Sequence, residues 1–252
     1  MKSLVHNYSQ GFFSPLEARR ILKKNPELKK WVYIPMLIDF IILLSSFGTS
    51  MYYIPILVES AIGYLPFAID GGFLYYLVLV PITILLWAVF IVFCLYVTFI
   101  LSTIVSSPFN SILAEKYLVL SGTVALQERG FKGEVGFFIK MFFTSLRKAL
   151  LFTFLGIIIF VCSFIPFVNI AATFSVFLIM SFDCMDYSFE VMGLSLRQRI
   201  QFVRQNGVSY FGHGSFLAVT SLIPGLTILL LPYGVLGAAE LIARAKNEYP
   251  TA

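Results

Sequence analysis

Charged residues are scarce in this chain. Asp, Glu, Lys and Arg make up 12% of the 252 residues, and 59% of the residues are hydrophobic. Soluble domains carry roughly a quarter charged residues. Three stretches contain no charged residue at all, namely 71–114, 149–182 and 205–239. Because a run of about 18 apolar residues is already long enough to cross a bilayer, we expect lipid to surround these stretches.

Residues suited to enzyme chemistry are also few. Cys94, Cys162 and Cys184 are isolated in apolar sequence, so they indicate neither a disulfide framework nor a metal cluster. His6 and His213 are the only histidines. The sequence contains no Gly-x-Ser-x-Gly elbow, no Gly-x-x-x-x-Gly-Lys phosphate loop and no His-Glu-x-x-His zinc helix. We therefore expect no enzyme, no cofactor, no metal site and no nucleic-acid partner.

The first two apolar blocks predict two long transmembrane helices. They cover 31–58 and 73–107, and Pro108 is expected to end the second because proline breaks a helix. The loop between them carries Glu59 and Asp70 but no Lys or Arg. Under the positive-inside rule this loop faces outward.

The last two apolar blocks predict helical hairpins. They cover 149–182 and 208–243, and each contains a proline near its middle, Pro166 or Pro224. Each block splits into arms of about 15 residues, which is short for a full crossing, so we expect hemi-penetrating hairpins tipped at the prolines. Six short full spans remain the alternative. Interrupted apolar segments of this kind are typical of a transporter's substrate path.

Basic residues gather in four polar segments. Seven lie in residues 1–30, six in 116–148, three in 197–204 and two after 239. Two spans and two hairpins would bring all four segments to one side, which the positive-inside rule makes the cytoplasm. The fold class expected is therefore an all-α membrane protein, a single integral domain over 1–252 with a cytoplasmic N-terminal segment.

Two polar stretches predict helices on the membrane surface. Ser195 and Gln198 form a capping-box pattern, and Asn206 supplies a stop. Ser14 and Pro15 predict a second helix start. Both stretches are equally compatible with soluble connector helices.

The segment 25–30 is the strongest candidate for ligand binding. Asn25 suits an N-cap and Pro26 a first helical position, and Lys29 and Lys30 follow within one turn. The free amides of a helix start, together with these lysines, favour an oxyanion. The alternative is that the lysines anchor the chain to lipid phosphates. Glu27 opposes an anion by its charge.

Several carboxylates lie near or within the apolar blocks. Asp183, Asp186 and Glu190 recur at helical spacing, and we expect them to pair with Arg197 and Arg199.

Asp39 and Glu115 lie near the ends of the first two apolar blocks. Asp39 requires a partner or a water-filled path if it lies deep in the membrane. Glu115 follows Pro108 and is expected to pair with the basic N-terminal segment.

The residues also resemble a known family. Residues 107–115 are similar to the Pro-Phe-Asn…Leu-Ala-Glu motif of the CysZ-type sulfate permeases, which share a superfamily with the etoposide-induced transmembrane proteins. Residues 186–189 resemble the family's Asp-Tyr-Pro-Phe, with Ser188 in place of the proline. Pro166, Pro224 and Pro232 stand where the family has its hairpin prolines and C-terminal signature. The similarity covers about 16–244.

The resemblance implies two long transmembrane helices with two hemi-penetrating hairpins, assembled as a homo-oligomer. It implies an inner-membrane protein in contact with lipids, importing sulfate or a related oxyanion for cysteine synthesis. The family's anion motif, Pro-Gly-Leu-Arg-Arg, falls on 26–30, which makes the implied substrate-binding residues Glu27, Leu28, Lys29 and Lys30. The implied pathway or supporting residues are Glu115, Pro166, Pro224 and Asp186.

The sequence departs from that motif in two ways. Glu27 replaces the glycine, and Lys29 and Lys30 replace arginines, which lose the forked geometry that suits sulfate oxygens. Two rival functions therefore remain open. One is a non-transporting membrane scaffold of the same fold, and the other is a cation-coupled carrier that uses Asp183 and Asp186.

Overall fold

The computed structural model describes residues 2–64, 73–125, 130–223 and 225–248. Within these residues the chain folds entirely into helices. In order they are α1 (Lys2–Lys24), the 3-10 turn η1 (Pro26–Leu28), α2 (Lys29–Gly63), α3 (Phe73–Leu120), α4 (Phe131–Cys162), α5 (Val168–Val191), α6 (Leu196–Gln205), α7 (Gly207–Ser221) and α8 (Leu226–Glu248).

Five segments are long and apolar enough to cross a membrane: Pro26–Gly63, Leu79–Leu120, Val135–Cys162, Val168–Val191 and Leu226–Ala245. The chain is thus an all-α membrane protein. Few residues are buried in the most apolar windows of α2, α3 and α4, whereas 72% of that of α8 is buried. Helix α8 is therefore an inner helix, and the others present apolar faces that only lipid or another apolar surface can cover.

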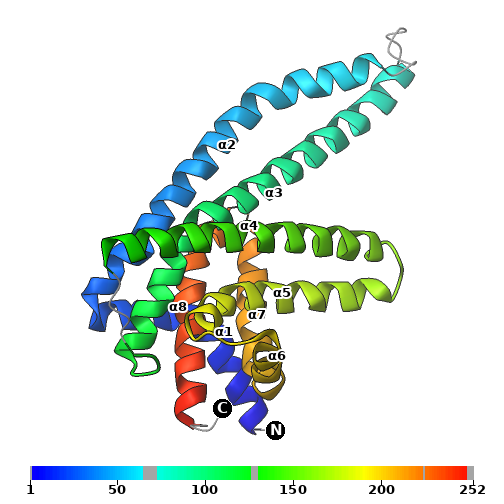
Figure 1. Cartoon of the computed structure of the whole chain (residues 1–252). Helices are drawn as coiled ribbons and strands as arrows, with labels where there is room; N and C mark the ends of the chain where they lie inside the picture. The colour runs from blue at the N-terminus through cyan, green and yellow to red at the C-terminus, as the bar shows by residue number, and fades with distance from the viewer. Residues whose placement is uncertain (1, 65–72, 126–129, 224, 249–252) are drawn as a thin grey trace.

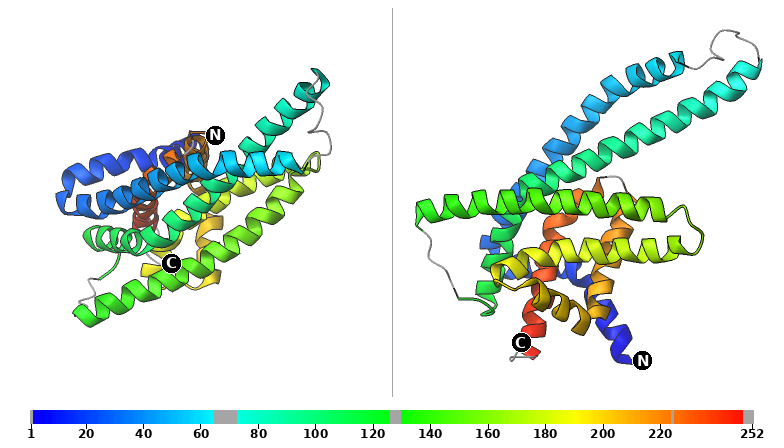
Figure 2. Two further views of the ribbon diagram at one scale, coloured as in Figure 1. Left: turned by 90° about the horizontal axis from the view of Figure 1, so that it is seen from above. Right: turned by 45° about the vertical axis from the view of Figure 1, so that its right-hand side comes forward.

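Three helix pairs extend from a common base. In Figure 1, α2 runs with α3, α4 with α5 and α7 with α8, and the three pairs point in different directions. Both views of Figure 2 agree with this arrangement. The two termini and α6 lie at one end of the molecule, while the ends where α2 stops and α3 starts lie at the other. The basic segments at the termini and on α6 therefore share one end.

The hydrophobic core lies in this base. Its members come from α1, α2, α3, α5, α7 and α8, and its fully buried side chains include Leu28, Val32, Leu113, Leu118, Val235, Leu236 and Ile242. Leu28 ends η1 and Val32 lies in the first turn of α2. The core therefore fixes the position of the lysines beside them.

Two predicted helix boundaries are wrong. Helix α1 runs through Ser14 and Pro15, and α3 runs through Pro108. A proline in a helix interior costs roughly 3 kcal/mol, so packing must offset it. In α1 the Ser14 hydroxyl lies 2.7 Å from the Gly11 carbonyl oxygen, to which it donates, and 2.9 Å from His213 Nδ1 of α7. These buried contacts hold α1 against α7.

Helix α4 is longer than the charge-free block that predicted it. It begins at Phe131 and includes Lys140, Arg147 and Lys148. Long basic side chains extend along a helix toward water, so charge-free length underestimates helix length. With 32 residues in α4 and 24 in α5, the expectation of short arms does not hold.

The turns at the predicted hairpin tips contain residues with positive φ angles. Pro166 lies between α4 and α5, and the next residue, Phe167, has a φ of 70°. Pro224 lies outside the described residues, and Gly225 after it has a φ of 80°. Glycine adopts this left-handed conformation without the steric cost that a side chain brings.

The predicted capping box and end of α6 are confirmed. Gln198 Oε1 accepts the Ser195 N–H at 2.8 Å, and the Gln198 N–H donates back to Ser195 Oγ at 3.5 Å. The helix ends before Asn206. Leu196 and Ile200 are exposed on its surface.

Glycines allow helices in the base to touch backbone to backbone. A Cβ placed on Gly214 of α7 would lie 1.9 Å from the Phe177 carbonyl oxygen of α5. A Cβ on Gly237 of α8 would lie 2.6 Å from the carbonyl carbon of Ser14 in α1. Such contacts are typical of helices packed within a membrane.

Candidate functional site: the lysine-bearing start of α2

The start of α2 presents charge at a fixed place. Leu28 is fully buried in the core, whereas Lys29 and Lys30 are exposed. The η1 turn uses the first amides internally, since the Leu28 N–H donates to the Asn25 carbonyl oxygen at 3.1 Å and the Lys29 N–H donates to that of Pro26. The Asn25 side chain bonds back to the backbone of α1 and does not cap the turn. Positive charge at the start of α2 therefore comes mainly from the lysine side chains and not from free backbone amides.

Trp31 brings Lys30 close to a third lysine, Lys116 of α3. Lys30 Nζ lies 5.4 Å from the centroid of the Trp31 ring, and Lys116 Nζ of α3 lies 5.5 Å from it. Cations at this distance are attracted to the indole face. The indole N–H of Trp31 is buried and has no hydrogen-bond partner within the described residues. We call Lys29, Lys30, Trp31 and Lys116 the Trp31 site.

Sequence analysis missed the Lys116 contribution. Lys116 follows directly on the 107–115 motif, and only the packing of α3 against α2 brings it to Trp31. The position of this basic residue directly after a family motif was the sequence feature that could have indicated its role.

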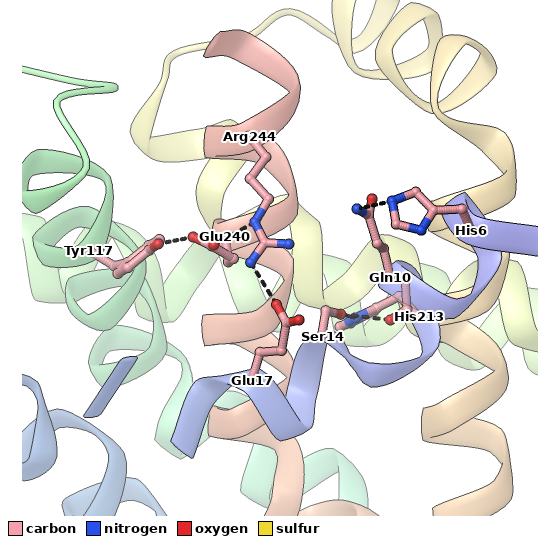
Figure 3. Close-up of polar contacts among 9 residues, drawn as sticks. His6, Gln10, Ser14, Glu17, Tyr117, His213, Glu240 and Arg244 are labelled. Carbon is pink, nitrogen blue, oxygen red and sulfur yellow. Dashed lines mark hydrogen bonds and ion pairs between the residues drawn. The ribbon is translucent and has the colours of Figure 1, made fainter. Parts of the chain in front are cut away.

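A polar clasp fixes the end of α3 that carries Lys116. Figure 3 shows the Tyr117 hydroxyl donating to the Glu240 carboxylate of α8. Arg244 donates from Nε to Glu240 at 2.6 Å and from a terminal nitrogen to Glu17 of α1 at 2.7 Å (Figure 3). The clasp therefore ties α1, α3 and α8 together next to the Trp31 site.

A stripe of buried polar side chains runs along α3 toward Lys116. Its members recur at helical spacing and are nearly or fully buried: Thr98, Ser102, Thr103, Ser106, Ser107, Asn110 and Ser111. The hydroxyls of Thr103 and Ser111 lack partners within the described residues, whereas Ser102 lies within hydrogen-bond reach of Asp39 and Asn110 within reach of Tyr187. Buried polar groups are normally hydrogen-bonded, so these two free hydroxyls suit water or a polar ligand. We call this set the α3 stripe.

Two other helices contribute polar groups to the α3 stripe. The Ser106 hydroxyl donates to Asp39 Oδ1 of α2 at 2.5 Å, and Ser107 hydrogen-bonds with Ser145 of α4. Asp39 is fully buried and its other oxygen has no partner within the described residues. The sequence allowed an interfacial or a deep position for Asp39. In the structure Asp39 is buried inside the protein, with Ser106 as a hydrogen-bond partner.

A second ionic cluster lies on α4, α5 and α6. Lys148 pairs with Asp186 and, at 2.6 Å, with Glu190, and Arg199 pairs with Asp186. The predicted pairing with Arg199 is confirmed. Arg197 is exposed and makes no ion pair among the described residues, and the Lys148 contribution was not foreseen. Asp186 of α5 thus links α5 to α4 and α6 through its ion pairs.

The remaining predicted site residues fall in separate places. Glu27 is exposed beside the Trp31 site, and Glu115 is half-buried on α3 next to Lys116. Pro166 lies in the α4–α5 turn, and Pro224 is outside the described residues. Within the described part of the chain, no group of three or more His, Cys, Asp or Glu residues is arranged to hold a metal ion.

Comparison with known proteins gives one consistent result. The family model described as "Sulfate transporter CysZ/Etoposide-induced protein 2.4" matches residues 14–232. A protein of Pseudomonas paraeruginosa named Sulfate transporter CysZ is 25% identical over 237 residues, covering 88% of this chain and 90% of the relative. One of Pseudomonas fluorescens with the same name is 27% identical over 233 residues, covering 88% and 89%.

The fold defines a multi-pass, all-helical membrane protein with a basic cluster at one end. The chain belongs to the CysZ/etoposide-induced protein family, which is a family of transporters and not of enzymes.

Proposed function

We propose that the protein is a permease for sulfate or a related oxyanion in the cytoplasmic membrane and that it supplies sulfate for cysteine synthesis. One observation carries the proposal. Lys30 and Lys116 lie over the ring of Trp31, whose indole N–H is buried without a partner among the described residues, and Lys116 follows the buried polar stripe of α3. Sulfate offers negative charge and strong acceptor oxygens, which complement these donors. The distant relatives named sulfate transporters support the same substrate.

The anion would bind among Glu27, Leu28, Lys29 and Lys30, with Lys116 as an added partner. Because the η1 turn occupies its own amides, the lysine side chains and the Trp31 N–H supply the attraction. Lysine acts as a compact point charge without a bidentate fork. Glu27 would weaken the field at this position, so binding should depend strongly on ionic strength.

The pathway would follow the α3 stripe. Its free hydroxyls, those of Thr103 and Ser111, would replace part of the hydration shell of the anion, as polar groups do in other selective pores. Glu115 would orient a basic neighbour, and Asp186 would brace α4, α5 and α6 around the path.

The same proposal includes a topology. Helices α2 and α3 would cross the bilayer. The α4–α5 and α7–α8 pairs point in other directions than α2 and α3, so they would enter it part-way with Pro166 and Pro224 at their tips, even though α4, α5 and α8 are each long enough to cross. The N-terminus would face the cytoplasm because the basic segments share that end. The exposed apolar faces would be covered by lipid and by further copies of the chain in a homo-oligomer.

Radiolabelled sulfate uptake by proteoliposomes tests the function. The purified protein should carry sulfate faster than empty liposomes, and uptake no faster than in empty liposomes would sink the proposal. The variant Asp39→Asn removes the acid beside the α3 stripe, so its uptake should be at least as fast as wild type if the stripe is the path.

A second candidate is a non-transporting membrane scaffold. Helix α6 favours it, because α6 exposes Leu196 and Ile200 together with basic residues, as surface-lying amphipathic helices do. Reversing the charges of Arg197 and Arg204 should then disturb membrane association or assembly, with no flux to lose. Measurable sulfate uptake by the wild-type protein would exclude this alternative.

A further inference from the structure

The first half of α4 exposes a face that is basic along one edge and apolar along the other. At 3.6 residues per turn, its basic residues fall within about 80° of one another around the helix. They are Lys132, Lys140 and Arg147, and all three are exposed. The adjoining edge is apolar, and its side chains are between 37% and 55% exposed: Ile139, Phe142, Phe143 and Leu146. We call these seven residues the α4 face.

The opposite side of α4 packs against the rest of the protein. Met141, Ser145 and Ala149 are buried there, and Ser145 hydrogen-bonds with Ser107 of α3. In Figure 1 this half of α4 crosses the base beside α3, whereas the second half runs alongside α5. The α4 face is therefore held on the outside of the molecule.

The charge of the α4 face is positive. None of its three basic residues forms an ion pair within the described part of the chain. The one acid in the sequence of α4 is Glu134, whose side chain lies outside the described ones. The three cations thus present their charge to whatever covers this face.

The surface of α4 changes after Lys148. Residues 149–162 carry no charge, and they expose large apolar side chains, including Leu150, Phe154 and Ile157. A helix of 32 residues is about 48 Å long, whereas the hydrocarbon core of a bilayer is roughly 30 Å thick. The second half of α4 therefore suits the hydrocarbon core, and the first half suits the headgroup layer beside it.

We propose that the α4 face binds anionic phospholipids, with their phosphates against the basic edge and their acyl chains against the apolar edge. Long basic side chains extend from an apolar helix surface to the headgroups, and basic clusters beside a membrane segment attract anionic lipids. A soluble acidic protein fits this face poorly, because the apolar edge continues into the lipid-facing surface of residues 149–162. The inference does not depend on sulfate transport, because lipid binding requires no transported anion.

Lipid titration of the purified protein tests the α4 face. The protein in a neutral detergent is titrated with phosphatidylglycerol or with phosphatidylcholine of the same acyl chains, and native mass spectrometry measures the bound lipid. The wild type should bind phosphatidylglycerol at least about fivefold more tightly than phosphatidylcholine. The triple variant Lys132→Gln, Lys140→Gln and Arg147→Gln should lose at least about tenfold in affinity for phosphatidylglycerol. Phe143→Ser should weaken the binding of both lipids, because it shortens the apolar edge.

The matched control is the triple variant Arg20→Gln, Lys23→Gln and Lys24→Gln, which removes three exposed charges from α1. It should bind phosphatidylglycerol as the wild type does. Equal affinity of the wild type for the two lipids, unchanged binding in the α4 triple variant or an equal loss in the control would overturn the proposal.

Two further results would also overturn it. Displacement of the lipid by sulfate or inorganic phosphate would indicate a site for free anions. A changed number of chains per particle, with unchanged lipid binding, would assign the α4 face to contact between copies of the chain. Thermal unfolding in detergent checks that each variant is folded. If the α4 triple variant does not fold, unchanged lipid binding in Phe143→Ser overturns the proposal instead.

Discussion

At the scale of single residues, Trp31 connects the buried and the exposed parts of the candidate site. Its ring attracts Lys30 from α2 and Lys116 from α3, and its N–H is buried without a partner in the described part of the chain. An unpaired buried donor is costly, so an oxyanion that accepts from it gains more than a surface contact would give.

Replacing this donor gives the first prediction. Trp31→Phe keeps an aromatic ring beside the lysines but removes the indole N–H. Sulfate affinity should fall by about tenfold, because a hydrogen bond to a charged group contributes about 1.5–3 kcal/mol. Equilibrium binding of labelled sulfate to the purified protein measures it. Trp87→Phe, in the middle of α3, is the control and should bind normally. Equal affinity in both variants would remove Trp31 from the site.

Lys148 gives a second prediction at the same scale. It is the ammonium shared by Asp186 and Glu190, and Asp186 is almost fully buried. Lys148→Met should lower the free energy of unfolding by about 3–5 kcal/mol, because removing one partner leaves buried charge uncompensated. Thermal unfolding in detergent measures the loss. Lys140→Met, at an exposed position of the same helix, should unfold like the wild type, and equal stability of the two variants would contradict the bracing role.

Sequence patterns predicted part of this cluster and missed the rest for a physical reason. The spacing of Asp183, Asp186 and Glu190 indicated one helix face, and the pairing of Asp186 with Arg199 followed from their closeness in sequence. Lys148 comes from α4, and only tertiary packing brings it there. Tertiary packing likewise brings Lys116 of α3 close to Trp31 of α2. Local patterns do not encode which distant helix packs against which.

At the scale of elements, backbone contact between helices determines where helices continue. Prolines 15 and 108 predicted helix boundaries, yet α1 and α3 run through both. The capping box of α6 predicted its start correctly because that signal is local and α6 is exposed. The predicted helix boundaries are thus correct where the helix faces solvent and wrong where neighbouring helices pack against it.

The contact between α7 and α5 provides the test at this scale. Gly214→Ala would bring a methyl group against the Phe177 carbonyl oxygen, where backbone has little freedom to move. We expect a loss of more than about 1–3 kcal/mol in stability, typical of an overpacked core. Thermal unfolding and folded yield in detergent measure it. Gly136→Ala, with nothing within 4 Å, is the control. A Gly214→Ala protein as stable as this control would contradict the close packing.

At the scale of the whole molecule, the chain separates charge from apolar surface. The termini and α6 share one end, and the α2–α3 and α4–α5 pairs present exposed apolar faces. Positive charge retained on one side is the usual determinant of orientation. The arrangement therefore predicts that the basic end stays in the cytoplasm.

Cysteine accessibility tests that orientation. In a background without the native cysteines, Lys24→Cys and Arg204→Cys should react with a membrane-impermeant reagent only from the cytoplasmic side. Tyr64→Cys, at the far end of α2, should react only from outside. Labelling of Lys24→Cys and Arg204→Cys from opposite sides would exclude the proposed topology.

Sulfate uptake by a site variant tests the central claim most directly. Proteoliposomes containing the triple variant Lys29→Ala, Lys30→Ala and Lys116→Ala are compared with the wild type and with a control that neutralises the exposed Lys23 and Lys24. The proposal predicts uptake that falls by at least about tenfold in the triple variant, since it removes most of the attraction for the anion, and little change in the control. Uptake by the triple variant equal to that of the wild type would contradict entry through the Trp31 site.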